Sequence, residues 1–235
     1  MKRRYFPLLA ALALCGCVVN IGNRAATGPM EHETRSIDKD NAERVHADLH
    51  MSAGELRVSG GAPNLMTADF AYNVAAWKPD VRYTNVGGRG NLTLDQPKGG
   101  AHGNAKNTWD LRFNDDVPID LSMQLGAGEA RMDLGMLDLR SVDLQMGVGE
   151  MKMDLRGNPK HDYDVHVRGG VGEATIYVPA TAGIYATAAG GIGGVEVTGL
   201  RKVGSHWESD SYQSAKTQIH LDVSGGVGEI KIIAE

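Results

Sequence analysis

Cysteine is nearly absent from this 235-residue sequence: it has two, Cys15 and Cys17, both close to the N-terminus. The remainder of the chain therefore has no pair that could form a disulfide, even in an oxidising compartment. Aromatic residues are also scarce, at 6% of the chain, and no G-K-[ST] phosphate-binding loop is present. We expect a domain that is held together by packing of aliphatic side chains.

The N-terminus has the pattern of an export signal. Three basic residues precede the apolar run Tyr5–Leu14, which is too short to span a membrane. The run ends in LCGC, with a leucine three residues before Cys17 and the small Gly16 directly before it, the spacing that lipoprotein signal peptidase accepts. We predict that residues 1–16 are a lipoprotein signal peptide and that Cys17 carries covalent lipid such as palmitate, the only attached group that we expect. The alternative is an ordinary secretory signal with incidental cysteines.

The segment after Cys17 is polar and poor in aromatics, and we interpret residues 17–44 as the acylated N-terminus and a tether. Val18 stands where an aspartate would favour inner-membrane retention, so we expect the outer membrane if the host is Gram-negative. Removing residues 1–16 takes away three positive charges and changes the formal net charge from −5 to −8. This acidic balance argues against nucleic acid as a partner.

One ten-residue string returns along the chain, as LGAGEARMDL at 125, MGVGEMKMDL at 146, GGVGEATIYV at 169 and GGVGEIKIIA at 225. The three consecutive intervals from Gly128 through Gly149 and Gly172 to Gly193 are 21, 23 and 21 residues, and such near-equal spacing indicates a solenoid. The period is too short for helix pairs and fits one coil of β-structure. Aligned on the second glycine, the copies lie at Gly54, Gly128, Gly149, Gly172, Gly193 and Gly228.

Apolar and polar residues alternate on both sides of each G-x-G, as in residues 142–144 and 151–153. Period two is typical of half-buried strands, and the glycines suit a tight corner that needs positive φ. Stacking the coils in register predicts one internal column of Met132, Met153 and Ile176.

The same stacking predicts a surface ladder of Glu129, Glu150 and Glu173, with Arg131 and Lys152 two residues further along. The ladder is our candidate binding site, either for a cation or as the acid row of a polysaccharide-cleaving β-helix. The favoured interpretation is a solvated edge that sets strand register. Like charges about 4.8 Å apart in water repel by only ~0.9 kcal/mol, and the nearby cations can neutralise them.

No metal site is expected. A calcium-binding nonapeptide repeat needs an aspartate where this chain has Ala174 and Ile230. His206 and His220 have no partner at metal-ligand spacing. A dinucleotide fingerprint needs a third glycine and a following helix, and neither is present in the pattern. We also expect no catalytic residue, because the repeats contain no clustered pair of unneutralised acids.

Residues 45–118 are predicted to form N-terminal strands and a capping sheet, and residues 119–235 the coils of the solenoid. Most aromatics fall in 61–116, and we expect them to form the core of that cap; the alternative is that exposed Trp77 or Trp109 stacks on sugar rings. The insertion GLRKVGSHWESDSYQSAK is predicted to cap the other end, through Trp207 and Tyr212.

The segment NTWDLRFNDDVPIDL, taken with the G-x-G-E coils, resembles the toast-rack domains of bacteria over nearly all of the mature chain. The resemblance implies an all-β, single-stranded β-solenoid. The toast-rack domain is similar to the extracytoplasmic part of membrane proteins in the Gram-positive response to cell-wall antibiotics. It implies no established activity and no catalytic motif.

Taken together, the sequence predicts a lipid-anchored β-solenoid of the bacterial cell envelope that acts as a non-catalytic binding or scaffold module. The expected partners are the membrane, through the lipid, and an envelope protein or glycan. Two alternatives stay open. One is a glycan-active β-helix enzyme, against which the repeats show no clustered pair of unneutralised acids and Asp115-Asp116 fits a turn. The other is an adhesin-like or self-assembling protein that pairs through an exposed coil end.

Overall fold

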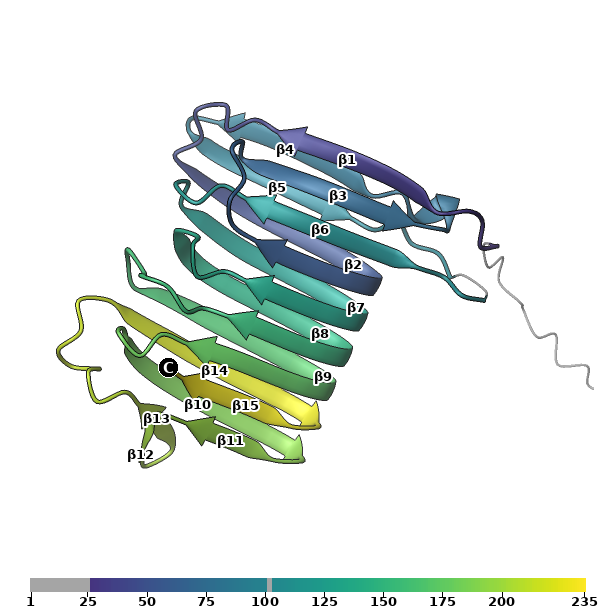
Figure 1. The fold of residues 1–235 in the computed structure, drawn as a ribbon. Helices are drawn as coiled ribbons and strands as arrows, with labels where there is room; N and C mark the ends of the chain where they lie inside the picture. The colour runs from purple at the N-terminus through teal and green to yellow at the C-terminus, as the bar shows by residue number, and fades with distance from the viewer. Residues whose placement is uncertain (1–25, 101–102) are drawn as a thin grey trace, which may run out of the picture.

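The computed structural model describes residues 26–100 and 103–235, which form one continuous stack of strands (Figure 1). The predicted signal peptide, Cys17 and the first part of the predicted tether lie outside these residues. The strands are β1 (Glu31–Ile37), β2 (Arg44–Ser59), β3 (Met66–Tyr72), β4 (Asp80–Val86), β5 (Arg89–Asp95), β6 (Asn107–Phe113), β7 (Ile119–Asp133), β8 (Leu139–Asp154), β9 (Tyr163–Val178), β10 (Gly183–Ile192), β11 (Val195–Thr198), β12 (Arg201–Val203), β13 (His206–Glu208), β14 (Gln218–Val227) and β15 (Ile230–Ala234), and a 3₁₀ turn, η1, spans Ala75–Trp77.

Each of β2, β7, β8 and β9 is one long strand that bends at a corner, so that its first half lies in one layer and its second half in the other (Figure 1). The corner is G-x-G in β7, β8 and β9 and Ser-Ala-Gly in β2. The bend needs glycine for two reasons. The φ angle of Gly128 is 138°, a value that residues with a side chain rarely adopt. A Cβ at Gly128 would also lie 1.8 Å from the carbonyl oxygen of Gly54 in the neighbouring coil. The repeated glycine is therefore fixed by the corner itself.

The coils are parallel and in register, which confirms the predicted β-solenoid. Met132 pairs with Met153 across β7 and β8, and Met153 pairs with Ile176 across β8 and β9. All three side chains are buried and form a column between the two layers. Ile232 of β15 continues the column beyond Ile176.

The order of the last two coils in space differs from their order in the chain. The C-terminal coil, β14 and β15, lies between β9 and the coil made of β10 and β11. β14 pairs with β9 on one side and with β10 on the other, always in parallel. The insertion between β11 and β14 supplies the length of chain that this crossing requires, and β10 becomes the outermost coil.

The insertion also covers that outermost coil. Its hairpin, β12 and β13, pairs antiparallel with β10 through β13. Trp207 is half-buried there, with the Lys202 ammonium 5.3 Å from the centre of its ring. Tyr212 packs against Tyr185, with ring centres 5.7 Å apart. The insertion thus covers the end of the stack with the two aromatics expected from the sequence.

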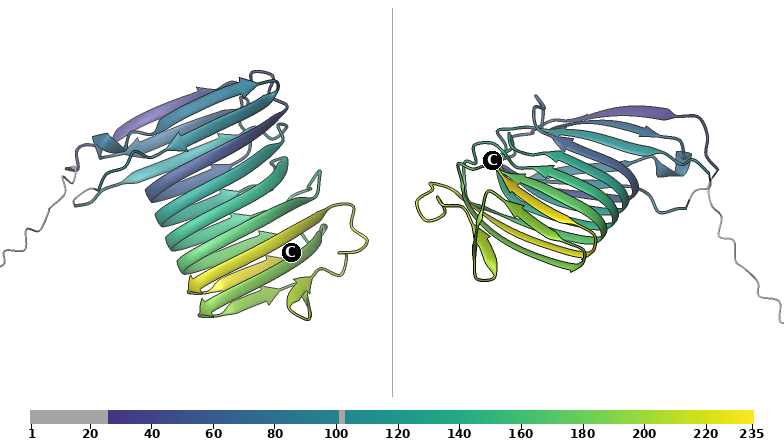
Figure 2. Two further views of the ribbon diagram at one scale, coloured as in Figure 1. Left: turned by 180° about the vertical axis from the view of Figure 1, so that it is seen from behind. Right: turned by 60° about the horizontal axis from the view of Figure 1, so that its bottom comes forward.

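At the other end, β2 is itself a complete coil, because it pairs in register with β7 along its whole length. Residues 45–118 are therefore a coil plus a cap. The first half of β2 pairs with β5, which is joined to β4, and its second half pairs with β6, which is followed by β3 and β1. Two small sheets thus extend the two layers separately, as Figure 2 shows from behind and from below.

At this end one expectation needs correction and one alternative is excluded. Glu31–Ile37 is not part of a tether but forms β1, which pairs with β3 along seven residues because its backbone completes the edge of the cap. Trp77 and Trp109 are 7% and 0% exposed, which excludes the alternative that sugar rings stack on them and agrees with the favoured expectation that the aromatics form the core of the cap. Trp109 instead packs edge-on against Phe70, with ring centres 5.6 Å apart, in the core of the cap.

Candidate functional site

The predicted glutamate ladder is present in the structure. Glu129 pairs in register with Glu150, and Glu150 with Glu173, across β7, β8 and β9. Glu55 of β2 extends the row by one coil. Because each glutamate directly follows its corner glycine, the row runs along the second layer, beside the corners. The glutamates of β7, β8 and β9 are all exposed.

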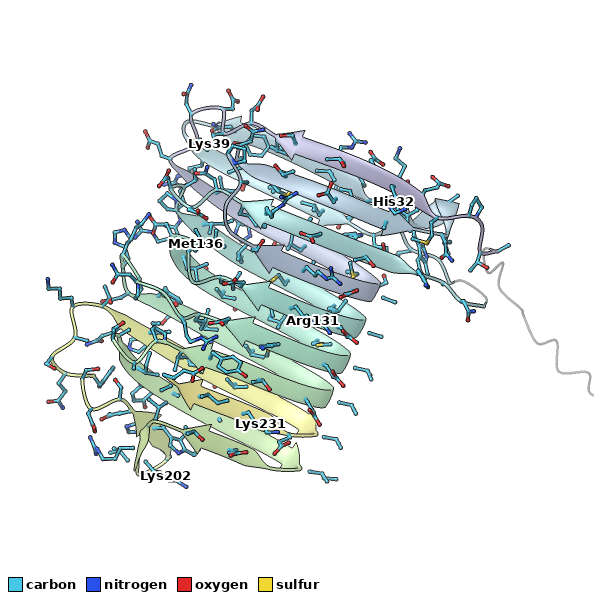
Figure 3. All side chains as sticks on the ribbon, viewed as in Figure 1. His32, Lys39, Arg131, Met136, Lys202 and Lys231 are labelled. Carbon is cyan, nitrogen blue, oxygen red and sulfur yellow. The ribbon has the colours of Figure 1, made fainter. Side chains whose placement is uncertain are left out.

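Cations neutralise the first part of the row. Arg131 donates to Glu129 at 2.9 Å and to Glu55 at 3.3 Å, so one guanidinium bridges two coils. Arg57 donates to Glu55 at 2.7 Å, and this hydrogen bond raises the pKa of the Arg57 guanidinium. At the far end Lys231 lies 2.8 Å from Glu229, and Figure 3 shows Arg131 and Lys231 on the same outward face.

The middle of the row is different. Lys152, expected to neutralise Glu150, lies over the ring of Tyr177 instead, 5.1 Å from its centre. The next coil has Thr175 where β2, β7, β8 and β15 have a cation. Within residues 26–100 and 103–235, neither Glu150 nor Glu173 forms a salt bridge. The sequence could not show this, because Tyr177 competes for Lys152 from a neighbouring coil.

These side chains line a hollow of about 240 Å³ on the second layer. Its carboxylates can attract a cationic or hydrogen-bonding group. In the part of the chain that the structure describes, no three His, Cys, Asp or Glu side chains are placed to hold a metal ion. The polar residues of the hollow are Glu129, Arg131, Glu150, Lys152, Glu173 and Thr175.

A second, larger hollow of about 710 Å³ lies on the first layer beside the corners, and the sequence reasoning missed it. It is overhung by the chain that leaves β5, where Gln96 is buried and its Oε1 accepts hydrogen bonds from the backbone N–H groups of Ser52 and Ala53. Only the topology brings this segment over the coils. The polar residues that line the hollow are His50, Ser52, Asp95, Gln96, Lys98, Gln124, Gln145 and Arg168.

The outward face of the first layer carries a strong ion pair between β2 and β7. Arg44 binds Asp120 through both carboxylate oxygens, at 2.6 and 2.7 Å, and Ser141 of β8 donates to the same group at 3.0 Å. Burial by itself would raise the pKa of Asp120, but the hydrogen bonds from Arg44 and Ser141 outweigh it and hold the pKa below its ordinary value. This contact ties three coils together.

The histidines of the C-terminal end also have structural partners. His206 lies 2.8 Å from Glu208 and stacks on Tyr185, with ring centres 4.4 Å apart. His220 lies 3.1 Å from Asp164. The stacking of His206 on Tyr185 joins the covering hairpin to β10, and the pairing of His220 with Asp164 joins β14 to β9. We assign no chemistry to these contacts.

Two family models match the chain. The model described as the N-terminal domain of toast_rack, DUF2154, matches residues 26–177. The model described as the C-terminal part of the cell wall-active antibiotics response protein LiaF matches residues 126–232. The two matches overlap over the middle coils and together span nearly all the described residues. No curated protein matches the sequence.

Among solved structures, one from Clostridium sporogenes, named a "putative cell adhesion protein", is 32% identical, with a TM-score of 0.86. The match covers 88% of this chain and 100% of that one. A "putative adhesin" from Bacteroides fragilis also matches over 88% of this chain and 99% of its own, at 12% identity and a TM-score of 0.34. The second similarity is too low to support an argument about this chain.

Proposed function

We propose that this chain, which belongs to the toast-rack family, is a lipid-anchored binding module of the bacterial cell envelope that performs no catalysis. The observation that carries the proposal is the open, charged hollow on a rigid stack of coils, with exposed Glu150 and Glu173 left without counter-charges within the described chain. The similarity to a structure named a "putative cell adhesion protein", over the whole length of that structure, supports a role in adhesion rather than in turnover.

The exposure of the ladder argues against a glycan-cleaving enzyme. Such an enzyme needs one carboxyl group that stays protonated near neutral pH, and burial in an apolar environment is the usual cause. Glu129, Glu150 and Glu173 all face water. A rigid row of exposed charges is better suited to holding a partner than to transferring a proton.

The anchor in this proposal is the lipid on Cys17. Among the described residues, no helix is long and apolar enough to cross a membrane. Three or two acyl chains on one cysteine give stable attachment, whereas a single chain gives only marginal binding. We propose the outer membrane as the location if the host is Gram-negative, because Val18 follows the cysteine.

Metabolic labelling with an alkyne analogue of palmitate tests the anchor. The wild type and Cys15→Ser should both incorporate the label, because Cys15 lies in the part of the signal that is removed. Cys17→Ser should incorporate none. Equal labelling of Cys17→Ser and the wild type would refute lipid attachment at this residue.

Photo-crosslinking in intact cells tests the binding role. A photoreactive amino acid at Lys152, inside the ladder hollow, should capture a discrete envelope component, and the same group at Asn158, at the opposite edge of the stack, should not. The double substitution Glu129→Gln and Glu150→Gln should abolish the capture at Lys152 without changing the thermal midpoint. Identical capture at both sites, or capture that survives the double substitution, would show that the ladder is not the binding surface.

A further inference from the structure

A row of exposed aliphatic side chains runs along the corners of the stack. Seven large apolar side chains are exposed in the described chain, and four of them occupy one position, the middle residue of G-x-G. Their exposed fractions range from 45% to 74%. Figure 3 shows side chains that project from the corners of the coils, away from both layers. The four residues are Val148, Val171, Val227 and Ile192.

The register places these residues side by side. Val148 pairs with Val171, Val171 with Val227, and Val227 with Ile192. The row continues through Ala127 to Ala53, so all six coils place an apolar residue there. Coils lie about 4.8 Å apart, which makes the row about 24 Å long. We name these six residues the corner ridge.

The fold does not require the corner ridge to be apolar. The flanking glycines are fixed by positive φ and by the close approach of neighbouring carbonyl groups. The residue between them points to solvent, where threonine would satisfy the preference of strands for β-branched side chains equally well. An exposed aliphatic row without one polar member is a mark of an interaction surface.

The chain enters the fold at the same edge. The backbone N–H of Gly28 donates to the carbonyl of Asn73 at 2.7 Å. Asn73 directly follows Tyr72, which pairs with Asn107, and the amide of Asn107 donates to the carbonyl of Ala53, the first residue of the corner ridge, at 3.1 Å. Figures 1 and 2 show the N-terminal end of the fold on the side of the corners.

This placement brings the predicted anchor within reach of the ridge. Eight residues lie between Cys17 and Ala26, and the nine Cα-to-Cα steps that join them span at most about 32 Å in an extended chain. A lipid on Cys17 therefore holds this edge of the domain close to the bilayer. We propose that the corner ridge lies on the surface of the membrane that carries the anchor, with its aliphatic side chains among the lipid headgroups. The inference rests on the lipid anchor of the proposed function.

Charge determines which lipid surface fits. The glutamate row lies two residues from the corner ridge, so it comes to the level of the headgroups when the ridge makes contact. Carboxylates are repelled by anionic headgroups, whereas zwitterionic ethanolamine headgroups offer ammonium groups as partners. A surface of phosphatidylethanolamine and phosphatidylcholine is therefore favoured over one rich in phosphatidylglycerol.

A single fluorophore on the ridge tests the contact. Because Cys17 is acylated in the mature protein and Cys15 is removed, Val171→Cys supplies the only free thiol. The mature acylated protein carries an environment-sensitive label at this thiol, in vesicles of phosphatidylethanolamine and phosphatidylcholine. We expect a blue-shifted emission and a several-fold weaker quenching by aqueous iodide than for the same label at Asn158→Cys, at the opposite edge. Phosphatidylglycerol should weaken the protection, and salt should restore it.

A matched variant and three outcomes decide the inference. Val148→Thr, Val227→Thr and Ile192→Thr, placed together in the Val171→Cys protein, should remove the protection. Equal quenching of the Val171 and Asn158 labels while the protein still floats with the vesicles would overturn the ridge contact and leave the anchor standing. Loss of flotation would overturn both the ridge contact and the anchor. Protection that depends on protein concentration and not on lipid would instead assign the ridge to a second copy of the chain.

Discussion

The middle coils and the C-terminal coils have the same kind of corner, but different side chains pack behind it. In β7 and β8, Leu125 and Met146 stand just before the first corner glycine and point into the stack. The same register position in β9, β14 and β10 holds Gly169, Gly225 and Gly190. A small apolar cavity of about 30 Å³ lies where side chains are missing. The corner glycines thus set the path of the chain, while the packing behind them varies from coil to coil.

The difference extends to the strands themselves. β7 and β8 each run through the corner as one unbroken strand, whereas the last two coils are each divided at the corner, into β14 and β15 and into β10 and β11. The divided coils are also the ones whose order in space is exchanged. β9 is unbroken and follows β8 in the stack, yet glycine also stands behind its corner. The packing behind the corner therefore varies independently of strand continuity and of the order of the coils.

The largest effect is expected in the packed middle coils. Met153→Lys places a charge without a partner in the internal column, which should cost at least about 4 kcal/mol of unfolding free energy and unfold the stack cooperatively. Lys152→Met, one residue away on the outer face, should change stability by roughly 0.5 kcal/mol or less. Denaturant unfolding of both variants provides the measurement. Equal midpoints would refute the assigned register.

Substitution of the second corner glycine should destabilise the protein even in the coils where few side chains pack behind the corner. Gly172 has φ of 140°, and a Cβ there would lie 1.7 Å from the carbonyl oxygen of Gly149. Gly172→Ala should therefore lower the free energy of unfolding by more than about 2 kcal/mol, from backbone strain and from displacement of the adjacent coil. Thermal unfolding followed by circular dichroism gives the value. A loss of unfolding free energy of less than about 1 kcal/mol would mean that the backbone of the corner shifts to accommodate the added Cβ.

The sequence predicts the repeating part of the molecule well because the features that it depends on are local. Alternation fixes which side chains face inward, and the corner glycines align the coils, so Met132, Met153 and Ile176 follow directly. The exchanged order of the last coils could not be predicted, since GGIG at 190 and GGVG at 225 are nearly the same corner. Either coil could pair with β9 on the basis of pattern alone.

The candidate site was predicted only in part, because its charges are arranged by neighbours from other coils. The ladder follows from the repeat, but the attraction of Lys152 to Tyr177 depends on two coils packing side by side. β1 was missed because EHETRSI is too polar to resemble a buried strand, and it is indeed mostly exposed at the edge of the cap. The large hollow depends on a crossing segment whose position is set by the whole fold.

In contrast to Gly172→Ala, adding a methyl group should stabilise the protein at a corner position that has free space. A Cβ at Gly169 would meet only the carbonyl oxygen of Ser224, at 3.8 Å, and the position lines the small cavity. Gly169→Ala should raise the free energy of unfolding by about 1 kcal/mol, since alanine restricts the unfolded chain and fills part of the void. The same measurement on Gly172→Ala is the matched control, three residues along the same strand. A loss of stability in Gly169→Ala would refute the idea that the corners are underfilled.

The smallest effect on stability is expected from the pairs on the outward face of the first layer. These pairs are Arg44 with Asp120 and, at the C-terminal end, histidine with aspartate. Asp120 has a pKa lowered by Arg44 and Ser141 despite its burial. A lowered pKa in the folded state means that the carboxylate stabilises the fold above its unfolded pKa, 3.8, and that this contribution is lost as the pH falls through the folded value.

Because Arg44 is largely exposed, Asp120→Asn should cost only about 0.5–1 kcal/mol at neutral pH. The difference between the wild type and Asp120→Asn should shrink as the pH falls below 3.8 and should disappear only once the pH is below the lowered pKa of the folded state. Asp143→Asn, on the same face without an ion pair in the described chain, should show a smaller difference at neutral pH. Urea unfolding at several pH values separates the cases, and a wild-type advantage that persisted after full protonation would show that the contact acts through shape rather than charge.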